Sequence, residues 1–231
     1  MKNWKAIKLY RKVFIRFIKD IITRDRFKFS QKLNSKINFE HYILLNQEVV
    51  RNETFDSKIY NFSIAGQKIN QYVLKPNEIF SFWNIIGNPD KQFKKGRTIQ
   101  NGKIIEEVGG GLCQVSGIIY YISLIAGLKI LERHNHSVDI YNDATRFCPL
   151  GTDATLVYGY KDLRILNENA FPIKFEILIT NNIISIKLLS TEKIEENILA
   201  FKTEKQEEYT FVSIKDSSEK VLNISKYKNI I

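Results

Sequence analysis

A cysteine that directly follows a run of glycines is the feature of this sequence best suited to chemistry. The run Gly109-Gly-Gly-Leu-Cys113 precedes an apolar segment that extends from Val115 to Leu128. A cysteine at a helix N-terminus lies where the helix dipole favours the thiolate, which is the nucleophilic form of the side chain. The sequence therefore predicts that Cys113 is a nucleophile for covalent chemistry.

A candidate base and a candidate acid follow the cysteine along the chain, so the three residue types of a catalytic triad are present. His134 and His136 come after the predicted helix, and we favour His136 as the base, with Asp153 orienting its ring. Acyl transfer also needs donors for the developing oxyanion, which backbone N–H groups between Gly111 and Gln114 can supply. The alternative is a structural cysteine, since cysteine is often buried in protein cores.

Other kinds of site can use some of the same residues. Zinc prefers cysteine and histidine ligands, but the closely spaced cysteine pairs of common structural zinc sites are missing, so we predict no metal and no cofactor. Glycines before a helix can also hold an anion, although the Lys-Ser/Thr pair of a nucleotide-binding P-loop is absent. A peptide carboxylate remains a suitable ligand. The residues predicted to bind substrate are Gly109, Gly110, Gly111, Gln114, Ser116, His134 and Arg97.

The bulk composition is that of a globular protein with an uneven charge distribution. The chain has 231 residues, of which 44% are hydrophobic and 26% charged. Residues 1–31 contain ten Lys and Arg against two Asp, which gives +8 of the total net charge of +10. The rest of the chain offers no matching basic surface, so nucleic acid is not an expected partner. Two cysteines cannot form a disulfide framework.

The basic N-terminal segment has the pattern of an amphipathic helix. Apolar side chains recur at helical spacing over residues 3–29, and lysines and arginines fill much of the remaining surface. Such helices lie on anionic membranes, and the alternative is a solvated helix packed on its own domain. The first apolar run is broken by Arg16, so we expect neither a signal peptide nor a membrane span. The expected location is the cytoplasm or the inner face of the membrane.

The elements around Cys113 predict an α+β fold. The helix that Cys113 opens should end near Gly127, and it should be buried because it is apolar on almost all sides. A short helix is expected over residues 63–73, with Ser63 as its N-cap. The strands expected are 79–83, 103–108, 129–133, 138–141, 154–158 and 163–166, a hairpin over 172–189, and one further strand at 209–214. The central helix should then pack on a mainly antiparallel sheet.

Two motifs together resemble the VanW family. They are Gly109-Gly-Gly-Leu-Cys-Gln-Val-Ser116 and Glu132-Arg-His-Asn-His-Ser137, and the resemblance extends over residues 60–190. It points to the short, stand-alone branch of the family. Gly117 departs from the pattern, because serine or threonine is common at that position. The domains expected are a basic helix over 1–31, a VanW-like domain over 32–190 and a charged C-terminal extension over 191–231.

The resemblance implies a cell-envelope protein linked to glycopeptide resistance. Some multidomain members are similar to L,D-transpeptidases, which would make Cys113 the nucleophile of acyl transfer on peptidoglycan stem peptides. The expected partners are therefore a peptidoglycan precursor or stem peptide, and an anionic membrane surface for residues 3–29. The alternative is a non-catalytic module that binds a precursor or an envelope protein through the same cleft.

Overall fold

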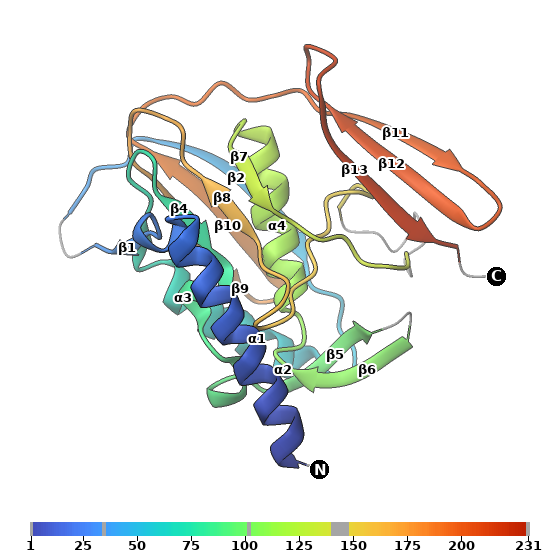
Figure 1. Ribbon diagram of the computed structural model, residues 1–231. Helices are drawn as coiled ribbons and strands as arrows, with labels where there is room; N and C mark the ends of the chain where they lie inside the picture. The colour runs from blue at the N-terminus through green and yellow to red at the C-terminus, as the bar shows by residue number, and fades with distance from the viewer. Residues whose placement is uncertain (1, 34–35, 101–102, 140–147, 230–231) are drawn as a thin grey trace.

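The computed structural model describes residues 2–33, 36–100, 103–139 and 148–229. A central helix, α4 (Leu112–Ile125), is surrounded by sheets and other helices (Figure 1). Its side chains at Val115, Ile118, Ile119 and Ile122 are at most 1% exposed. The helix ends just before Gly127, whose φ of +65° suits a glycine C-cap. The predicted buried helix is therefore confirmed.

Every pairing between the described strands is antiparallel, and together with the helices this confirms the α+β class. One three-stranded sheet has the order β2 (His41–Glu48), β10 (Ile183–Ser190), β9 (Ile173–Thr180). A second has the order β4 (Ile79–Ser81), β8 (Arg164–Leu166), β7 (Lys129–Glu132). The remaining pairs in this part of the fold are β5 (Lys95–Gln100) with β6 (Lys103–Val108), and β1 (Gln31–Lys32) with β3 (Tyr72–Val73).

Several predicted strands and the hairpin are confirmed with small shifts at their ends. The strand expected at 103–108 is β6, and those expected at 129–133 and 163–166 are β7 and β8. The hairpin over 172–189 is β9 and β10, and Asn181 at its turn has a φ of +55°. Asparagine tolerates this left-handed conformation better than most residues, which is why the Asn-Asn pair marked the turn.

Two helices correct the expectations drawn from the sequence. The helix expected over 63–73 is α2 (Phe55–Ile69), and Ser63 lies inside it, donating from its hydroxyl to the Ile59 carbonyl at 2.9 Å. The strand expected over 79–83 stops at Ser81. The Ser81 hydroxyl there accepts a hydrogen bond from Asn84 N at 3.2 Å and caps α3 (Phe82–Ile86).

Two further predicted strands, 154–158 and 138–141, are not found as strands in the described residues. Residues 154–158 form no strand, and Val157 makes only an isolated bridge to Lys161. This segment instead runs past α4, where it makes the contacts described below. Of the strand predicted at 138–141, only Val138 and Asp139 lie within the described residues, and Val138 forms an isolated bridge to Lys228.

The C-terminal segment forms a sheet of its own beside the central helix. Its strands are β11 (Ala200–Lys205), β12 (Tyr209–Lys215) and β13 (Val221–Lys228), in that order. The strand expected at 209–214 is β12, and the sequence did not reveal the other two. Val212, Ile214 and Tyr227 are at most 1% exposed, so this sheet packs on the rest of the protein through one face (Figure 1).

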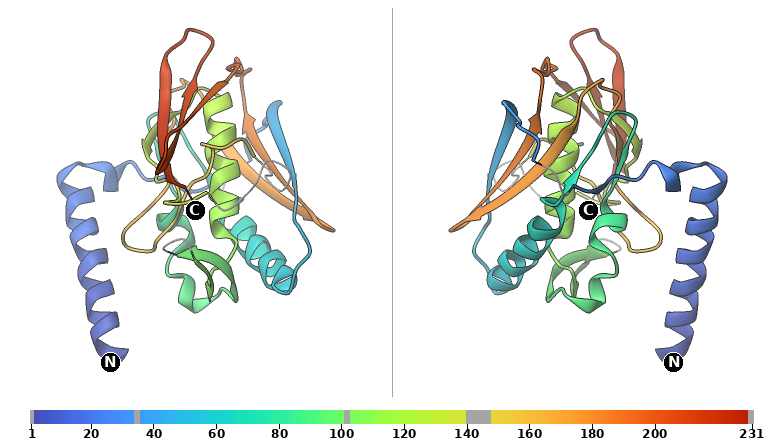
Figure 2. Two further views of the ribbon diagram at one scale, coloured as in Figure 1. Left: turned by 90° about the vertical axis from the view of Figure 1, so that its right-hand side faces the viewer. Right: turned by 90° about the vertical axis from the view of Figure 1, so that its left-hand side faces the viewer.

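At the other end of the chain, α1 (Lys2–Ile22) lies along the side of the body (Figure 2). It is followed by the short helix η1 (Asp25–Phe27), and a second short helix, η2 (Pro89–Lys91), precedes β5. Within the described residues, no helix is both long and apolar enough to span a membrane.

Candidate functional site

Cys113 is the second residue of α4, and its side chain is partly buried. The Cys113 sulfur accepts a hydrogen bond from Leu156 N at 3.4 Å, so the segment after Asp153 fixes one side of the thiol. No described residue accepts a hydrogen bond from the backbone N–H of Cys113. This N–H lies at the positive end of the helix dipole, where it can donate to an anion. Cys113 and Cys148 both have free thiols.

The glycine run before Cys113 is required by close packing and by backbone conformation. Gly109 and Gly111 have φ angles of +83° and +96°, which favour glycine. A Cβ atom on Gly110 would lie 2.2 Å from the carbonyl carbon of Gly96, so only glycine fits there. The buried Asn61 amide donates to the Gly110 carbonyl at 2.9 Å and holds the turn in place. The glycines therefore position Cys113 by their backbone geometry.

His136 and Asp153 meet on the same side of α4 as Cys113. The Asp153 Oδ2 atom lies 2.8 Å from the His136 ring atom Nδ1 and also accepts the His136 backbone N–H at 2.6 Å. Cys113 lies near enough to the same imidazole to raise its pKa. Because Nδ1 is bound to Asp153, Nε2 is the ring nitrogen left to exchange a proton with the thiol. The structure thus brings together the three residues predicted to be catalytic.

The electrostatics of the three groups favour charged forms of the histidine and the aspartate. Burial alone would lower the pKa of His136, but the hydrogen bonds and charges of Asp153 and Cys113 raise it to about 10. Burial likewise opposes ionisation of Asp153, yet its hydrogen bond to His136 and the nearby Arg133 charge lower its pKa to about 2. At neutral pH the site therefore holds an aspartate and a cationic imidazole next to Cys113.

Arg133, Tyr227 and Ser225 hold the acid of this group in place. The Arg133 guanidinium forms an ion pair with Asp153 Oδ1 at 2.9 Å, and its Nε donates to the Asp153 carbonyl at 2.7 Å. The Tyr227 hydroxyl donates to the same Oδ1 atom, and the Ser225 hydroxyl accepts from Arg133 Nη1 at 2.7 Å. Two of these residues come from β13, which has no motif in the sequence that marks it as part of the site. Arg133 stood next to the predicted His134, but no spacing rule indicated its role.

His134 lies in a different cluster. Its Nε2 atom is 3.1 Å from Glu132 Oε1, and that carboxylate also accepts the backbone N–H of Asp162 at 2.9 Å. Glu132 is bound in addition by Arg16 of α1. His134 therefore faces the ionic contacts that hold α1, whereas His136 faces Cys113, which distinguishes the two histidines that the sequence left open.

The other residues predicted to bind substrate occupy varied places. Ser116 is fully buried, and its hydroxyl donates to the Ala154 carbonyl at 2.6 Å, so it holds α4 against that segment. The Gln114 amide donates to Gln47 Oε1 at 2.9 Å. Arg97 lies on β5 opposite Glu106, and its side chain falls outside the described residues.

No group of three or more potential metal ligands occurs in the described part of the chain. The cysteines and histidines that could offer zinc its preferred ligands are Cys113, His134, His136 and Cys148. Cys113 and His136 lie near Asp153, whereas His134 binds Glu132. Cys148 accepts a hydrogen bond from Gln47 Nε2 at 3.4 Å, and burial raises the pKa of its thiol to about 11. A thiol in that state is a poor nucleophile at neutral pH, which leaves Cys113 as the candidate nucleophile.

Comparisons with known proteins agree on one family. A family model described as VanW like protein matches residues 57–189. The vancomycin B-type resistance protein VanW of Enterococcus faecalis is 34% identical over 115 residues, which are 49% of this chain and 42% of that protein. The uncharacterized protein YoaR of Bacillus subtilis is 35% identical over 124 residues, 53% of this chain and 39% of that one. The alignments thus span less than half of either relative, and no solved structure matches.

Proposed function

This chain belongs to the VanW family, and we propose that it acts in glycopeptide resistance at the cell envelope as a cysteine-dependent acyl transferase on peptidoglycan stem peptides. The link to resistance rests on the E. faecalis relative, which is named for it. The observation that supports the chemistry is the His136–Asp153 pair, joined at 2.8 Å, next to the start of α4 where Cys113 lies.

In the proposed reaction the proton of the Cys113 thiol resides on His136, and the resulting thiolate attacks a carbonyl carbon of the stem peptide. The new C–S bond gives a tetrahedral oxyanion, to which the Cys113 backbone N–H at the start of α4 can donate. His136 then gives its proton to the amine as the C–N bond breaks, which leaves a thioester on Cys113. Attack by a second amine, or by water, transfers the acyl group and restores the thiol.

Asp153 has a positioning role in this scheme. With its pKa lowered to about 2, it stays ionised and keeps Nδ1 of His136 protonated and pointing away from the thiol. Arg133 and Tyr227 occupy its other oxygen, so the carboxylate has no freedom to rotate toward the sulfur. The imidazole is thereby held in the orientation in which Nε2 serves as acid and base.

An acyl-enzyme trapping experiment tests the proposal. The purified protein is incubated with a synthetic stem pentapeptide, and its intact mass is measured after rapid acid quenching. We expect an adduct equal to the peptide minus its leaving group, absent in Cys113→Ala and reduced by about 10²–10⁴-fold in rate in His136→Gln. The Cys148→Ser variant is the matched control and should form the adduct as the wild type does.

A binding measurement separates the alternative function from catalysis. If Cys113→Ala and the wild type bind the stem peptide equally and neither forms an adduct or a product, the protein is a binding module and the transferase proposal is wrong. Unchanged cross-linked products from Cys113→Ala would also contradict it, because the thioester cannot form without the sulfur.

A further inference from the structure

The apolar side of α1 points away from the protein. Nine large apolar residues of this helix are between 38% and 76% exposed, although such residues are normally buried. They are Trp4, Ile7, Tyr10, Phe14, Ile15, Phe17, Ile18, Ile21 and Ile22. A continuous exposed apolar surface of this kind on a globular protein marks a site of interaction.

The opposite side of α1 holds the helix to the body, mostly by charge. Asp20 is buried and receives both terminal nitrogens of Arg164, at 2.6 and 2.7 Å. Arg16 binds Glu132 and donates to the Tyr160 carbonyl at 3.0 Å. Ile18 is two residues from both Arg16 and Asp20, which at about 100° per residue places it on the far side of the helix.

In the N-terminal half of α1, packing against the body involves the same side of the helix as Arg16 and Asp20. Val13 and Leu9 lie against Gly159, where an added Cβ would come within 2.9 Å of the Val13 side chain. Leu9, Val13, Arg16 and Asp20 thus face the body from one side of α1, at helical spacing. The ion pairs and this contact fix which side of α1 is presented outward.

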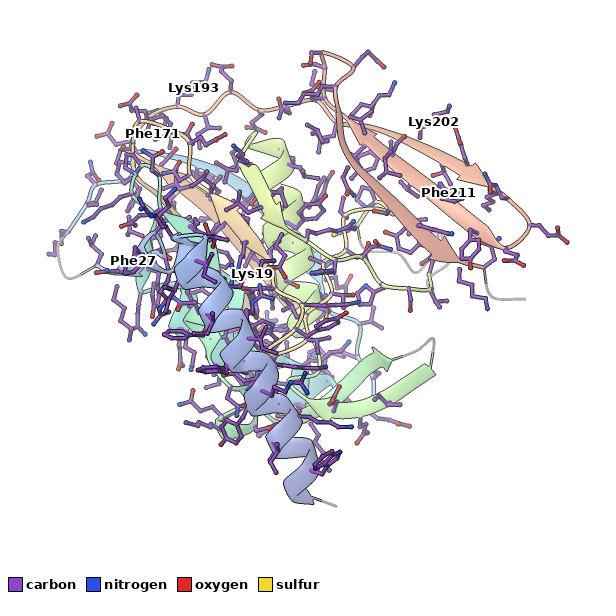
Figure 3. The ribbon with its side chains drawn as sticks, viewed as in Figure 1. Lys19, Phe27, Phe171, Lys193, Lys202 and Phe211 are labelled. Atoms are coloured by element: carbon purple, nitrogen blue, oxygen red, sulfur yellow. The ribbon has the colours of Figure 1, made fainter. Side chains whose placement is uncertain are left out.

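The charge of α1 indicates what covers its outward side. The helix contains seven Lys and Arg, and its one acidic residue, Asp20, is bound to Arg164. Two copies of this helix packed face to face would bring like charges together, which disfavours a dimer. An anionic lipid surface supplies both an apolar layer and the opposite charge. Lys19 and Phe27 lie on this side of the molecule, far from the C-terminal sheet that carries Lys202 and Phe211 (Figure 3).

We propose that α1 is an interfacial helix that binds an anionic lipid bilayer through its exposed apolar side, while the Asp20–Arg164 and Arg16–Glu132 ion pairs hold the folded body against the membrane surface. The helix lies in the plane of the interface, with its lysines at the level of the headgroups and Trp4 and Phe14 among the acyl chains. This inference does not depend on the chemistry proposed for Cys113.

Vesicle flotation of the full chain tests the proposal. The wild type is mixed with phosphatidylcholine vesicles that either lack phosphatidylglycerol or contain about one-quarter of it. We expect binding to the anionic vesicles that weakens at high salt, and at least about tenfold weaker binding to the neutral ones. The apolar-side variant F14Q/I18Q should bind the anionic vesicles at least about tenfold more weakly than the wild type.

A matched control places comparable changes on the C-terminal side of the molecule. The I198Q/I224Q variant likewise replaces two exposed apolar residues by glutamine, at positions that are 79% and 64% exposed, and should bind as the wild type does. Circular dichroism confirms that each variant is folded. Wild-type binding to anionic vesicles no stronger than to neutral ones, or equal losses in both variants, overturns the proposal. Self-association that F14Q/I18Q abolishes, without vesicle binding by the wild type, also overturns it in favour of a second copy of the chain.

Discussion

The hydroxyl of Tyr227 donates a hydrogen bond to the carboxylate of Asp153, across 74 positions of sequence. Tyr227 is 1% exposed and lies on β13, beyond residues 57–189 that match the family model. The C-terminal sheet of this chain is therefore joined to the candidate site rather than appended to it. It helps to hold the acid that orients His136.

The Tyr227–Asp153 hydrogen bond should contribute measurably to stability. Tyr227→Phe removes the hydroxyl and leaves Oδ1 of Asp153 with Arg133 alone, so we expect a loss of about 1.5–3 kcal/mol in the free energy of unfolding. Urea denaturation measures it. The control is Tyr42→Phe, at a position that is 60% exposed, which should change stability by less than about 0.5 kcal/mol. Equal effects of the two changes would show that the buried hydroxyl adds nothing.

The reactivity of Cys113 should depend on one histidine of the two. In a Cys148→Ser background, iodoacetamide labels Cys113 alone, and the cationic His136 should keep the labelling fast at pH 6. Because the pKa of His136 is raised to about 10, replacing it by alanine should slow labelling at pH 6 by about tenfold or more. His134→Ala is the matched control, and its rate should stay within about twofold of the parent, since His134 binds Glu132. Similar slowing in both variants would contradict the assignment of the base.

The glycine run should tolerate no side chain at its centre. Gly110→Ala places a methyl group 2.2 Å from the backbone carbon of Gly96, and we expect a loss of about 3 kcal/mol or more in the free energy of unfolding. Gly117→Ala in α4 provides the comparison, since its Cβ would be 3.5 Å or more from its neighbours. This change should be neutral or stabilise by up to about 1 kcal/mol, because alanine favours helices. Denaturation of both variants by urea gives the values, and a small loss for Gly110→Ala would rule out the close contact.

Local patterns account for what the sequence predicted correctly. The apolar run of α4, with Gly127 after it, and the alternating strands on either side of Asn181 carry their signals within the element itself. The helix and strand boundaries that the sequence predicted wrongly lie at serines, because a serine can either cap a helix or lie inside an element. Ser81 could continue a strand or cap a helix, and it caps α3. Ser63 resembled an N-cap but lies inside α2, whose start has Asn52 Oδ1 accepting the Thr54 backbone N–H at 3.0 Å.

The residues of the candidate site also fall into those that a local sequence signal indicates and those that only the tertiary structure brings to the site. Residue type and order were enough to select Cys113, His136 and Asp153, because nucleophile, base and acid are chemically distinctive. Tyr227 and Arg133 have no such signal. A tyrosine on a strand is usually a packing residue, and only the docking of β13 against the segment after β7, where Arg133 binds Ser225, brings its hydroxyl to Asp153. Contacts between elements distant in the sequence depend on the tertiary arrangement, which one sequence does not encode in any local pattern.

The stability of the protein should change with pH in a direction set by His136 and Asp153. The pKa of His136 is raised in the folded state from 6.5 to about 10. The contribution of His136 to the free energy of unfolding is therefore complete below about pH 6.5 and is lost as the pH rises through 10. The pKa of Asp153 is lowered from 3.8 to about 2, so its contribution is complete above about pH 4 and is lost as the pH falls through 2. Both contributions are complete between about pH 4 and pH 6.5.

Urea denaturation between pH 6 and pH 10 tests the direction in which His136 changes the stability of the protein. The difference in free energy of unfolding between the wild type and His136→Gln should be largest near pH 6 and should shrink toward pH 10, because the wild type loses the charged imidazole there. Asp153→Asn serves as the control, since removing its carboxylate removes the hydrogen bond and charge that raise the pKa of His136. In that background the same difference should be smaller and should shrink at a lower pH. A difference that stays constant from pH 6 to pH 10, or grows, would mean that His136 is not held as a cation beside Asp153.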